Sequence, residues 1–229
     1  MGRVQIAKLV AQGGGNPPYR YLMSPRLKNF YDNNYVNTYT SGNVVQFGNS
    51  ACLYYWGINY NNEASFFPSS YNDVQNIELQ CKFFPISIPG NLEEIFSLCS
   101  VFTPDWETNG CLGFWDNTSN QYWLEYPITI GNWYWLKLYY DKATYTQTWS
   151  LSTDGINFTT IGTHNENRNY DIENNWNSNG QDSWLLFGNL NTAGNIVTQR
   201  TFTTGRIDFN ETWIKVNGNF AGRGYIQSY

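Results

Sequence analysis

The sequence is poor in charge and in histidine, and it has no long hydrophobic run. Charged residues make up 14% of the 229, the net charge is −5, and His164 is the single histidine. The 13 Lys and Arg residues are scattered and do not form the basic stripe that a nucleic-acid backbone requires. No apolar run approaches the roughly 20 residues of a membrane-spanning helix. These absences predict a protein that binds neither nucleic acid nor membrane.

Cysteine is also scarce and is not arranged for metal binding. The four cysteines are Cys52, Cys81, Cys99 and Cys111. They contain no Cys-x-x-Cys pair, and one histidine cannot complete a zinc set with them. The first residues lack the apolar region of a secretory signal, because Gln5 and Lys8 interrupt a short apolar patch. We therefore favour reduced, structural cysteines over disulfides.

Aromatic residues, by contrast, are abundant, at 18% of the chain. Aromatic and β-branched residues favour pleated strands, while Asn and Gly favour turns. Residues 76–84 (NIELQCKFF) alternate with period two, as do residues 133–141 (WYWLKLYYD), and Asp154-Gly155 marks a hairpin turn. One face of the first segment holds Ile77, Leu79, Cys81 and Phe83. Recurring strands without a helical period predict an all-β, antiparallel sandwich or barrel.

The first 30 residues differ from the rest of the chain. Gly13 to Gly15, then Pro17-Pro18 and Pro25, are typical of an irregular segment. Two interpretations stay open: an N-terminal arm, residues 1–30, that docks the protein in a larger assembly, or a tail packed on its own domain. Residues 31–229 are predicted to form one domain.

Four stretches, taken in order, resemble the concanavalin A-like lectin/glucanase superfamily, and within it the laminin G-like jelly rolls. They are residues 76–85 (NIELQCKFFP), 131–162 (GNWYWLKLYYDKATYTQTWSLSTDGINFTTIG), 185–190 (LLFGNL) and 205–218 (GRIDFNETWIKVNG). The resemblance implies two antiparallel sheets packed face to face, with sugars bound at the concave face or loop rim in the family's lectins. The polar ending NGNFAGRG is similar to jelly-roll domains in structural and fibre proteins of tailed bacteriophages.

Catalytic carboxylates are not evident. The family's glucanases carry a Glu-x-Asp-x-x-Glu strand, which is absent here. Asp105 and Glu107 have the i, i+2 spacing that places two carboxyls together on a strand, but TPDWETNG is predicted to be a loop. Glu93 and Glu94 are adjacent and must face opposite ways. The sequence therefore predicts a protein that is not an enzyme.

Two further polar residues are given structural or solvated roles. Asp208 alternates with Ile207 and Phe209, so we expect it to bond the backbone or a neighbouring Lys or Arg. His164 stands in the polar stretch THNENRN, which is predicted to be a loop, and no Gly-x-Ser-x-Gly elbow accompanies it.

The sequence contains several acidic residues that are candidate oxygen ligands for calcium. Relatives in the family often bind Ca²⁺ through loop carboxylates and carbonyls, and Ca²⁺ requires six to eight oxygens. The candidate ligands are Asp116, Asp171, Glu173 and Asp182. They lack EF-hand spacing, so solvated loops are favoured and no cofactor is predicted.

Aromatic side chains are the best candidates for ligand contact, because ring faces stack on the C–H faces of sugars and also anchor protein interfaces. If Leu136 and Leu138 face the core, Trp133, Trp135 and Lys137 lie together on the opposite face. Further rings are predicted in or near loops at Trp106, Trp115, Trp123 and Trp176.

The leading hypothesis is a non-enzymatic structural or interaction protein of a phage virion, docked by its arm to other virion proteins in an oligomeric assembly and able to bind host-surface glycans. The alternative is a secreted, extracellular carbohydrate-binding lectin or module. A second alternative is an atypical glycan hydrolase or lyase.

Overall fold

The computed structural model describes residues 39–41, 44–46, 54–56, 70–99, 101–116, 119–165, 172–173, 185–187 and 202–223. The predicted arm, residues 1–30, lies outside these ranges. In the part of the chain that is described, no helix is long and apolar enough to span a membrane.

The largest sheet has eight strands in the order β1-β2-β14-β4-β10-β11-β12, with β15 paired to β14. All its pairings are antiparallel. Its strands are β1 (Tyr39–Ser41), β2 (Val44–Gln46), β4 (Asn76–Pro85), β10 (Tyr134–Asp141), β11 (Thr146–Ser152), β12 (Thr159–Asn165), β14 (Gly205–Val216) and β15 (Asn219–Arg223).

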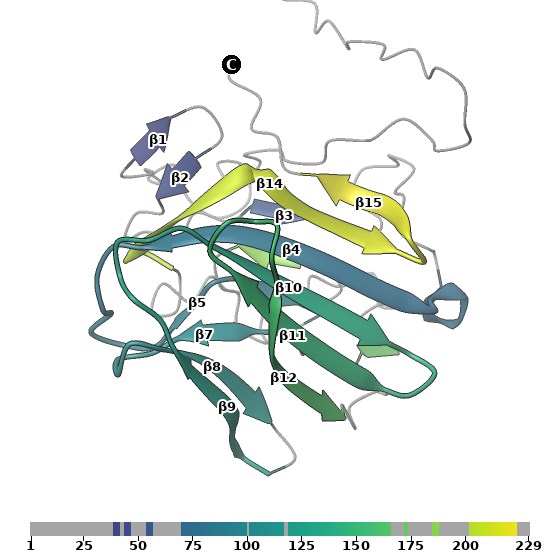
Figure 1. Ribbon diagram of the computed structural model, residues 1–229. Coiled ribbons are helices and arrows are strands. Elements are labelled where there is room, and N and C mark those ends of the chain that lie inside the picture. Colours follow the sequence, from purple (N-terminus) through teal and green to yellow (C-terminus); the bar gives the residue numbers. More distant parts are fainter. Residues whose placement is uncertain are drawn as a thin grey trace, which may run out of the picture.

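Two smaller antiparallel sheets form the second layer. One has the order β3-β13-β6 and the other β5-β7-β8-β9. Their strands are β3 (Tyr54–Trp56), β5 (Glu93–Glu94), β6 (Ser97–Leu98), β7 (Pro104–Trp106), β8 (Cys111–Asp116), β9 (Gln121–Pro127) and β13 (Leu185–Phe187). Only Ile95 and Phe96 separate β5 from β6, so the two small sheets continue each other. In Figure 1, β14, β4, β10 and β11 lie side by side, with β7, β8 and β9 below them.

The core lies between the layers and is rich in rings. Trp149 on β11 is 1% exposed and lies 4.7 Å from Phe114 and 6.1 Å from Phe96, measured between ring centroids. A short 3₁₀ helix, η2 (Tyr71–Asp73), precedes β4, and the hydroxyl of Tyr71 lies 3.0 Å from that of Tyr140. The predicted all-β, antiparallel sandwich is therefore confirmed.

The two strongest alternations in the sequence form adjacent central strands. β4 and β10 pair in antiparallel register with Leu138 opposite Leu79 and Leu136 opposite Cys81. These inward side chains are at most 1% exposed, and burial raises the pKa of the Cys81 thiol. Cys81 is thus a buried thiol, as its place in the pattern predicted.

Two stretches predicted to be loops contain strand residues. Residues 104–106 form β7, between β5 and β8, and residues 163–165 form the last part of β12, at the edge of the large sheet. The first part of β12 was predicted as a strand. β7 is short, and its central residue is Asp105, which leaves no period-two signal. His164 on β12 is stacked on Trp123, with 4.8 Å between ring centroids.

Strand β14 carries a bulge, because its register against β4 shifts between Asp208 and Trp213. The hydroxyl of Thr212 donates to the Asp208 carbonyl (2.8 Å) and accepts from the Lys82 amide (3.2 Å), which replaces the missing ladder bonds. The Asp208 carboxylate accepts from the Asn210 amide (3.0 Å) and lies 3.0 Å from Lys82 Nζ. The predicted structural role of Asp208 is confirmed.

Candidate functional site

The outer face of the eight-stranded sheet carries rings and charges in two neighbouring rows. In the first row Trp135 on β10 lies opposite Lys82 on β4, which lies opposite Asp208 on β14. In the second row Lys137 lies opposite Gln80, which lies opposite Trp213. We call the following outer-face residues the aromatic face: Lys82, Phe84, Trp133, Trp135, Lys137, Phe158, Glu211 and Trp213.

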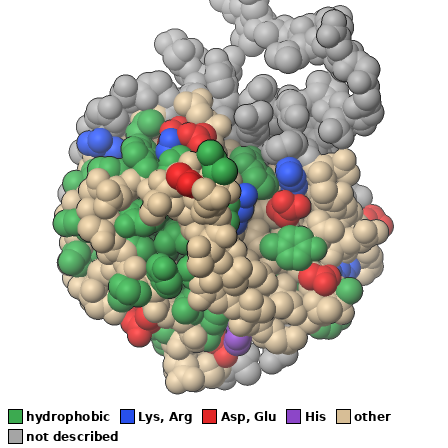
Figure 2. Space-filling model, in the orientation of Figure 1, with side chains coloured by type: hydrophobic (Ala, Val, Ile, Leu, Met, Phe, Trp, Pro, Cys, Tyr) green, Lys and Arg blue, Asp and Glu red, His purple; other side chains and the backbone are tan. Residues whose placement is uncertain are grey.

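Trp133, Trp135 and Lys137 are half-buried members of this face, on the side of β10 predicted from its alternation. Figure 2 shows the molecule from the side of β4, β10 and β14, with hydrophobic side chains gathered over one half of the surface and charged side chains above and beside them. The face therefore combines apolar rings with fixed charges.

Lys82 is the centre of the first row. Its ammonium lies 4.9 Å from the Trp133 ring centroid and 4.7 Å from that of Trp135. It also donates to Glu211 Oε1 at 2.6 Å and lies 3.0 Å from the carboxylate of Asp208. Burial disfavours the charged form, but the hydrogen bonds to Glu211 and Asp208 outweigh it and raise the pKa of Lys82. The cation is thus fully compensated by its neighbours.

Trp135 is held from two sides. Its indole N–H donates to Glu211 Oε2 at 2.7 Å. Gly155, in the β11–β12 hairpin, has φ +74, and a Cβ at this position would lie 2.9 Å from the indole. Burial acts to raise the pKa of Glu211, but the bonds from Lys82 and Trp135 lower it, so Glu211 stays ionised. The ring is therefore fixed in place before any ligand arrives.

Lys137, in the second row, has a different environment. Its ammonium lies 3.6 Å from the Phe158 ring centroid and 5.9 Å from that of Trp213. Burial lowers its pKa; Glu78 opposes this shift and the like charge of Lys215 adds to it. Lys215 itself lies 4.8 Å from the Trp213 ring and 3.9 Å from Glu78.

Hydroxyl groups border the aromatic face on the side of β11 and β12. Ser150 lies opposite Lys137 on β11, and its hydroxyl is 3.4 Å from that of Thr160 on β12. Thr148 and Thr163 form a second hydroxyl pair at 3.4 Å. Short hydroxyls beside rings provide both donors and acceptors for a polar ligand.

A second cluster lies on the other layer, on the face of the β5-β7-β8-β9 sheet that points away from the core. Glu94 lies opposite Asp105, Asp105 opposite Gly113, and Gly113 opposite Glu125. The hydroxyl of Tyr122 donates to Asp105 Oδ2 at 3.2 Å. We call Glu94, Asp105, Glu107 and Glu125 the carboxylate row.

Glu107 is an acid of this row whose environment disfavours its ionised form. It is 8% exposed, and its Oε1 has no hydrogen-bond partner among the residues that the structure describes. A Cβ on Gly113 would lie 1.8 Å from that oxygen, so the glycine leaves room for the carboxyl above the sheet. Burial, the charge of Glu125 and a hydrogen bond with Glu125 raise the pKa of Glu107 to about 7. A carboxylic acid that keeps its proton near neutral pH can act as a proton donor.

The remaining predicted rings have varied positions. Trp106 is fully buried and donates to the Ser87 carbonyl at 3.0 Å, so it packs within the core and offers no surface to a ligand. Trp115 is half-buried and lies 4.9 Å from Tyr122, edge to face, beside the carboxylate row. Trp123 packs on Phe114 and His164. Trp176 lies outside the described residues.

The calcium candidates are not brought together where the structure describes them. Asp116 lies 3.9 Å from His164 Nε2, and Glu173 is half-buried beside the buried Ile172. Asp171 and Asp182 lie outside the described residues. Among the described residues, no group of three or more His, Cys, Asp or Glu side chains could hold a metal ion.

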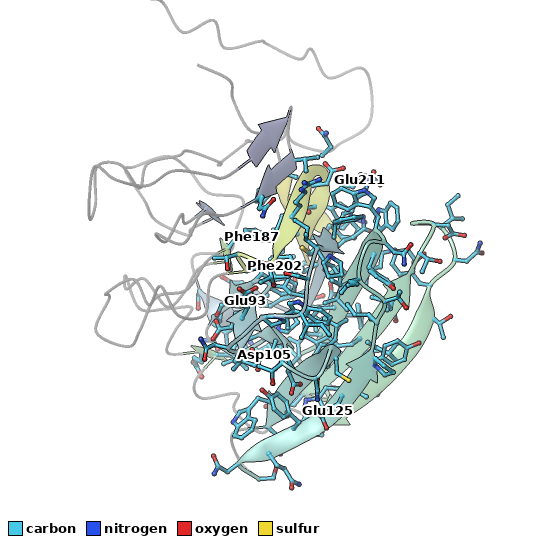
Figure 3. The ribbon with its side chains drawn as sticks, turned by 90° about the vertical axis from the view of Figure 1, so that its left-hand side faces the viewer. Glu93, Asp105, Glu125, Phe187, Phe202 and Glu211 are labelled. Carbon is cyan, nitrogen blue, oxygen red and sulfur yellow. The ribbon has the colours of Figure 1, made fainter. Side chains whose placement is uncertain are left out.

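The two clusters are separate. In Figure 3, Glu211 lies at the upper end of the described sandwich, whereas Asp105 and Glu125 lie in its lower half. Glu93, also labelled, faces away from the carboxylate row and accepts hydrogen bonds from the hydroxyls of Thr203 and Thr204, each at 2.6 Å. The adjacent Glu93 and Glu94 thus face opposite ways, as predicted.

Sequence reasoning did not name Lys82, Phe84, Phe158, Glu211 or Trp213 as site residues, and it weighed Glu94, Asp105 and Glu107 for catalysis but set them aside, without Glu125. The signal for Lys82 was present, because it alternates with the buried Cys81 and Phe83. Alternation could not place two of the others. Glu211 reaches the aromatic face because of the bulge in β14, and Phe158 because of the path that the chain takes before β12.

No family model and no curated protein sequence match this chain. Several solved structures, among them the following three, are similar to it over part of its length. The native heptameric SAP-like pentraxin from Limulus polyphemus has 18% identity and a TM-score of 0.38, and the match covers 64% of this chain and 65% of the pentraxin chain, less than two thirds.

The other two are catalytic domains of glycoside hydrolase family 131. The one from Coprinopsis cinerea has 11% identity, a TM-score of 0.40 and coverage of 76% of this chain and 73% of that one. The β-glucanase domain from Podospora anserina has 10% identity, a TM-score of 0.43 and coverage of 87% and 80%. None of the three is described as a phage protein, so these matches lend no support to the predicted virion role, and what this chain binds is inferred from its own side chains.

Proposed function

We propose that this protein binds glycans through the aromatic face of its eight-stranded sheet and does not cleave them there. The observation that supports this most is the fixed pair Trp133 and Trp135, with Lys82 lying within 5 Å of both ring centroids and Glu211 bonded to Trp135. Rings stack on the apolar faces of sugars, and nearby charged and hydroxyl groups bond the sugar edges.

Pre-organisation is what makes this face suited to a ligand. A ring that is already immobilised loses little rotational freedom when a sugar stacks on it. Trp135 is held by Glu211 and by contact with Gly155, and Trp133 lies 5.2 Å from the Phe84 ring. The acids that contact Lys82 are already paired with it, which suits sugar binding through hydrogen bonds and stacking better than acid–base chemistry.

A glycan array with the full chain tests this function. We expect the wild type to bind a defined set of glycans, and Trp135→Ala to lose that binding because the stacking platform is removed. Tyr145→Ala is the matched control, since Tyr145 is 41% exposed and lies in the β10–β11 turn, off the aromatic face. No bound glycan, or equal binding by all three proteins, contradicts the proposal.

The carboxylate row favours a second candidate function, hydrolysis of a glycan. In glycosidases one carboxylic acid protonates the leaving oxygen while a second carboxylate acts as base or nucleophile. Glu107, with its pKa raised to about 7, has the protonation state of the acid, and the exposed Glu125, to which it is hydrogen-bonded, would be the partner once a sugar separates the two carboxyls. Trp115 and Tyr122 would border the sugar.

Release of reducing ends from a polysaccharide panel tests this second candidate. Hydrolysis by the wild type that is lost in Glu107→Gln and Glu125→Gln but kept in Trp135→Ala would assign the activity to the carboxylate row. An absence of product with every polysaccharide would leave binding as the function. The predicted virion location, docking partners and oligomeric assembly stay predictions.

A further inference from the structure

The two lysines at the centre of the aromatic face differ in how their charge is balanced. Lys82 has two carboxylates within 3.0 Å of its ammonium. The ammonium of Lys137, in the next row of the same face, makes no hydrogen bond or ion pair with any described residue and rests on the Phe158 ring at 3.6 Å. A partly buried cation is disfavoured unless an anion approaches it.

Two described charged groups act on Lys137 in opposite directions. Glu78 is the carboxylate whose charge favours the ionised form of Lys137, and it lies 3.9 Å from Lys215. Burial and the charge of Lys215 lower the pKa of Lys137, which is the reverse of what its neighbours do to Lys82.

The position of Lys137 is suited to a charged sugar. It follows Trp135 by two residues on the same face of β10, so the two side chains are about 7 Å apart along the strand. Ser150 lies opposite Lys137, with its hydroxyl beside that of Thr160. A sugar over Lys137 thus has an adjacent ring platform, a cation and hydroxyl donors within one patch.

We infer that the glycan bound by the aromatic face is acidic, carrying a carboxylate or sulfate, and that Lys137 binds this anionic group. This inference rests on the proposed function and names its ligand class. The anion completes the charge balance that the described residues leave open at Lys137, and Phe158 and Trp213 shield the resulting ion pair from water.

The test uses the full chain, an array that contains uronate, sialylated, sulfated and neutral glycans, and three variants. We expect the wild type to prefer acidic glycans. Lys137→Met should lower affinity for the best acidic glycan by on the order of tenfold or more, because a charge-assisted hydrogen bond is lost. Lys137→Arg should restore it. Trp135→Ala should lower affinity for every bound glycan.

The best carboxylate glycan is then compared with its carboxyl-reduced form, which keeps the sugar rings and removes the charge. We expect the wild type to bind the reduced form more weakly and Lys137→Met to bind both forms alike. Affinity for the acidic form should fall with added salt. Thermal melts show whether each variant is folded.

The two ways of failing are distinct. If the wild type prefers neutral glycans and Lys137→Met binds them unchanged, the acidic ligand is wrong while glycan binding stands. If no glycan binds, or if Trp135→Ala binds as the wild type does, the proposed function fails and this inference fails with it.

Discussion

Glu107 and Lys137 are both titratable side chains that the fold withdraws from water without a direct counter-ion among the described residues. Each is held toward its neutral form, since the pKa of Glu107 is raised to about 7 and that of Lys137 is lowered. Perturbed groups of this kind mark functional sites more often than chance. Lys137 was among the predicted residues because it alternates with core leucines. Glu107 was set aside, because its spacing from Asp105 fell in a stretch predicted to be a loop.

The raised pKa of Glu107 predicts a loss of stability as pH rises. The folded state keeps a proton that the unfolded chain releases near pH 4.5, so the free energy of unfolding falls between pH 4.5 and about 7. The fall attributable to this group is about 3 kcal/mol at most. Glu107→Gln has no carboxyl proton to lose, so this part of the fall in the free energy of unfolding should be absent in the variant. Urea unfolding at pH 4.5, 6 and 8 measures the difference.

Glu78→Gln is the control for this experiment, because Glu78 lies on the other layer, outside the carboxylate row. It should still show the fall in stability that Glu107 causes. If Glu107→Gln and the wild type lose the same stability between pH 4.5 and 8, Glu107 is ionised at neutral pH and cannot serve as the acid in the second candidate function.

Among the elements, β14 shows which features of a strand can be predicted from period-two alternation and which cannot. Ile207 and Phe209 are buried at odd positions, whereas Ile214 and Val216 are buried at even ones. A regular strand cannot bury both sets on one face, so the change of parity requires the bulge between them. That change is visible in the sequence, but which side chains the bulge presents depends on the partner strand. Glu211 could not be placed beside Lys82 and Trp135 without it.

Thr212 is the residue that holds this bulge. It is fully buried, and its hydroxyl bonds both Asp208 and Lys82 main-chain groups. We expect Thr212→Val, which keeps the shape, to lower the free energy of unfolding by about 1–3 kcal/mol, because buried polar groups lose their partner. Thr160→Val, at an exposed strand position, should cost less than about 0.5 kcal/mol.

Urea titrations of the two variants make the comparison, and the glycan affinity of Thr212→Val should fall as well because Glu211 loses its position. Equal stability of the two threonine variants would mean that the bulge does not depend on this hydroxyl.

At the scale of the whole molecule, the sequence specified the architecture better than the surface. Period-two alternation predicted β4, β10 and the hairpins around Asp154-Gly155, because each such strand buries one face. It did not predict that β7 would place Asp105 opposite Glu94. Cross-strand neighbours depend on which segments pair, and the alternation within one segment does not identify its partner strand. The aromatic face was predicted only along β10, for the same reason.

The two layers are joined through Trp149, which reaches from β11 to Phe96 and Phe114 of the second layer. We expect Trp149→Ala to lower the free energy of unfolding by about 3–5 kcal/mol through the cavity that it leaves. Trp149→Phe should lose less, because it retains a ring. Denaturant unfolding with near-ultraviolet circular dichroism follows the loss of core packing.

Trp135→Ala serves as the comparison, since Trp135 is only half-buried and lies outside the core. Were it to cost as much stability as Trp149→Ala, the contact between the layers would not be the main source of cohesion in this sandwich.

The central claim, that the aromatic face is the glycan site, is tested most directly by a crystal structure of the full chain with its best glycan from the array. We expect sugar rings stacked on Trp133 and Trp135, with an anionic group beside the Lys137 ammonium. Sugar density over Asp105 and Glu125 in the carboxylate row, with the aromatic face empty, would contradict the account.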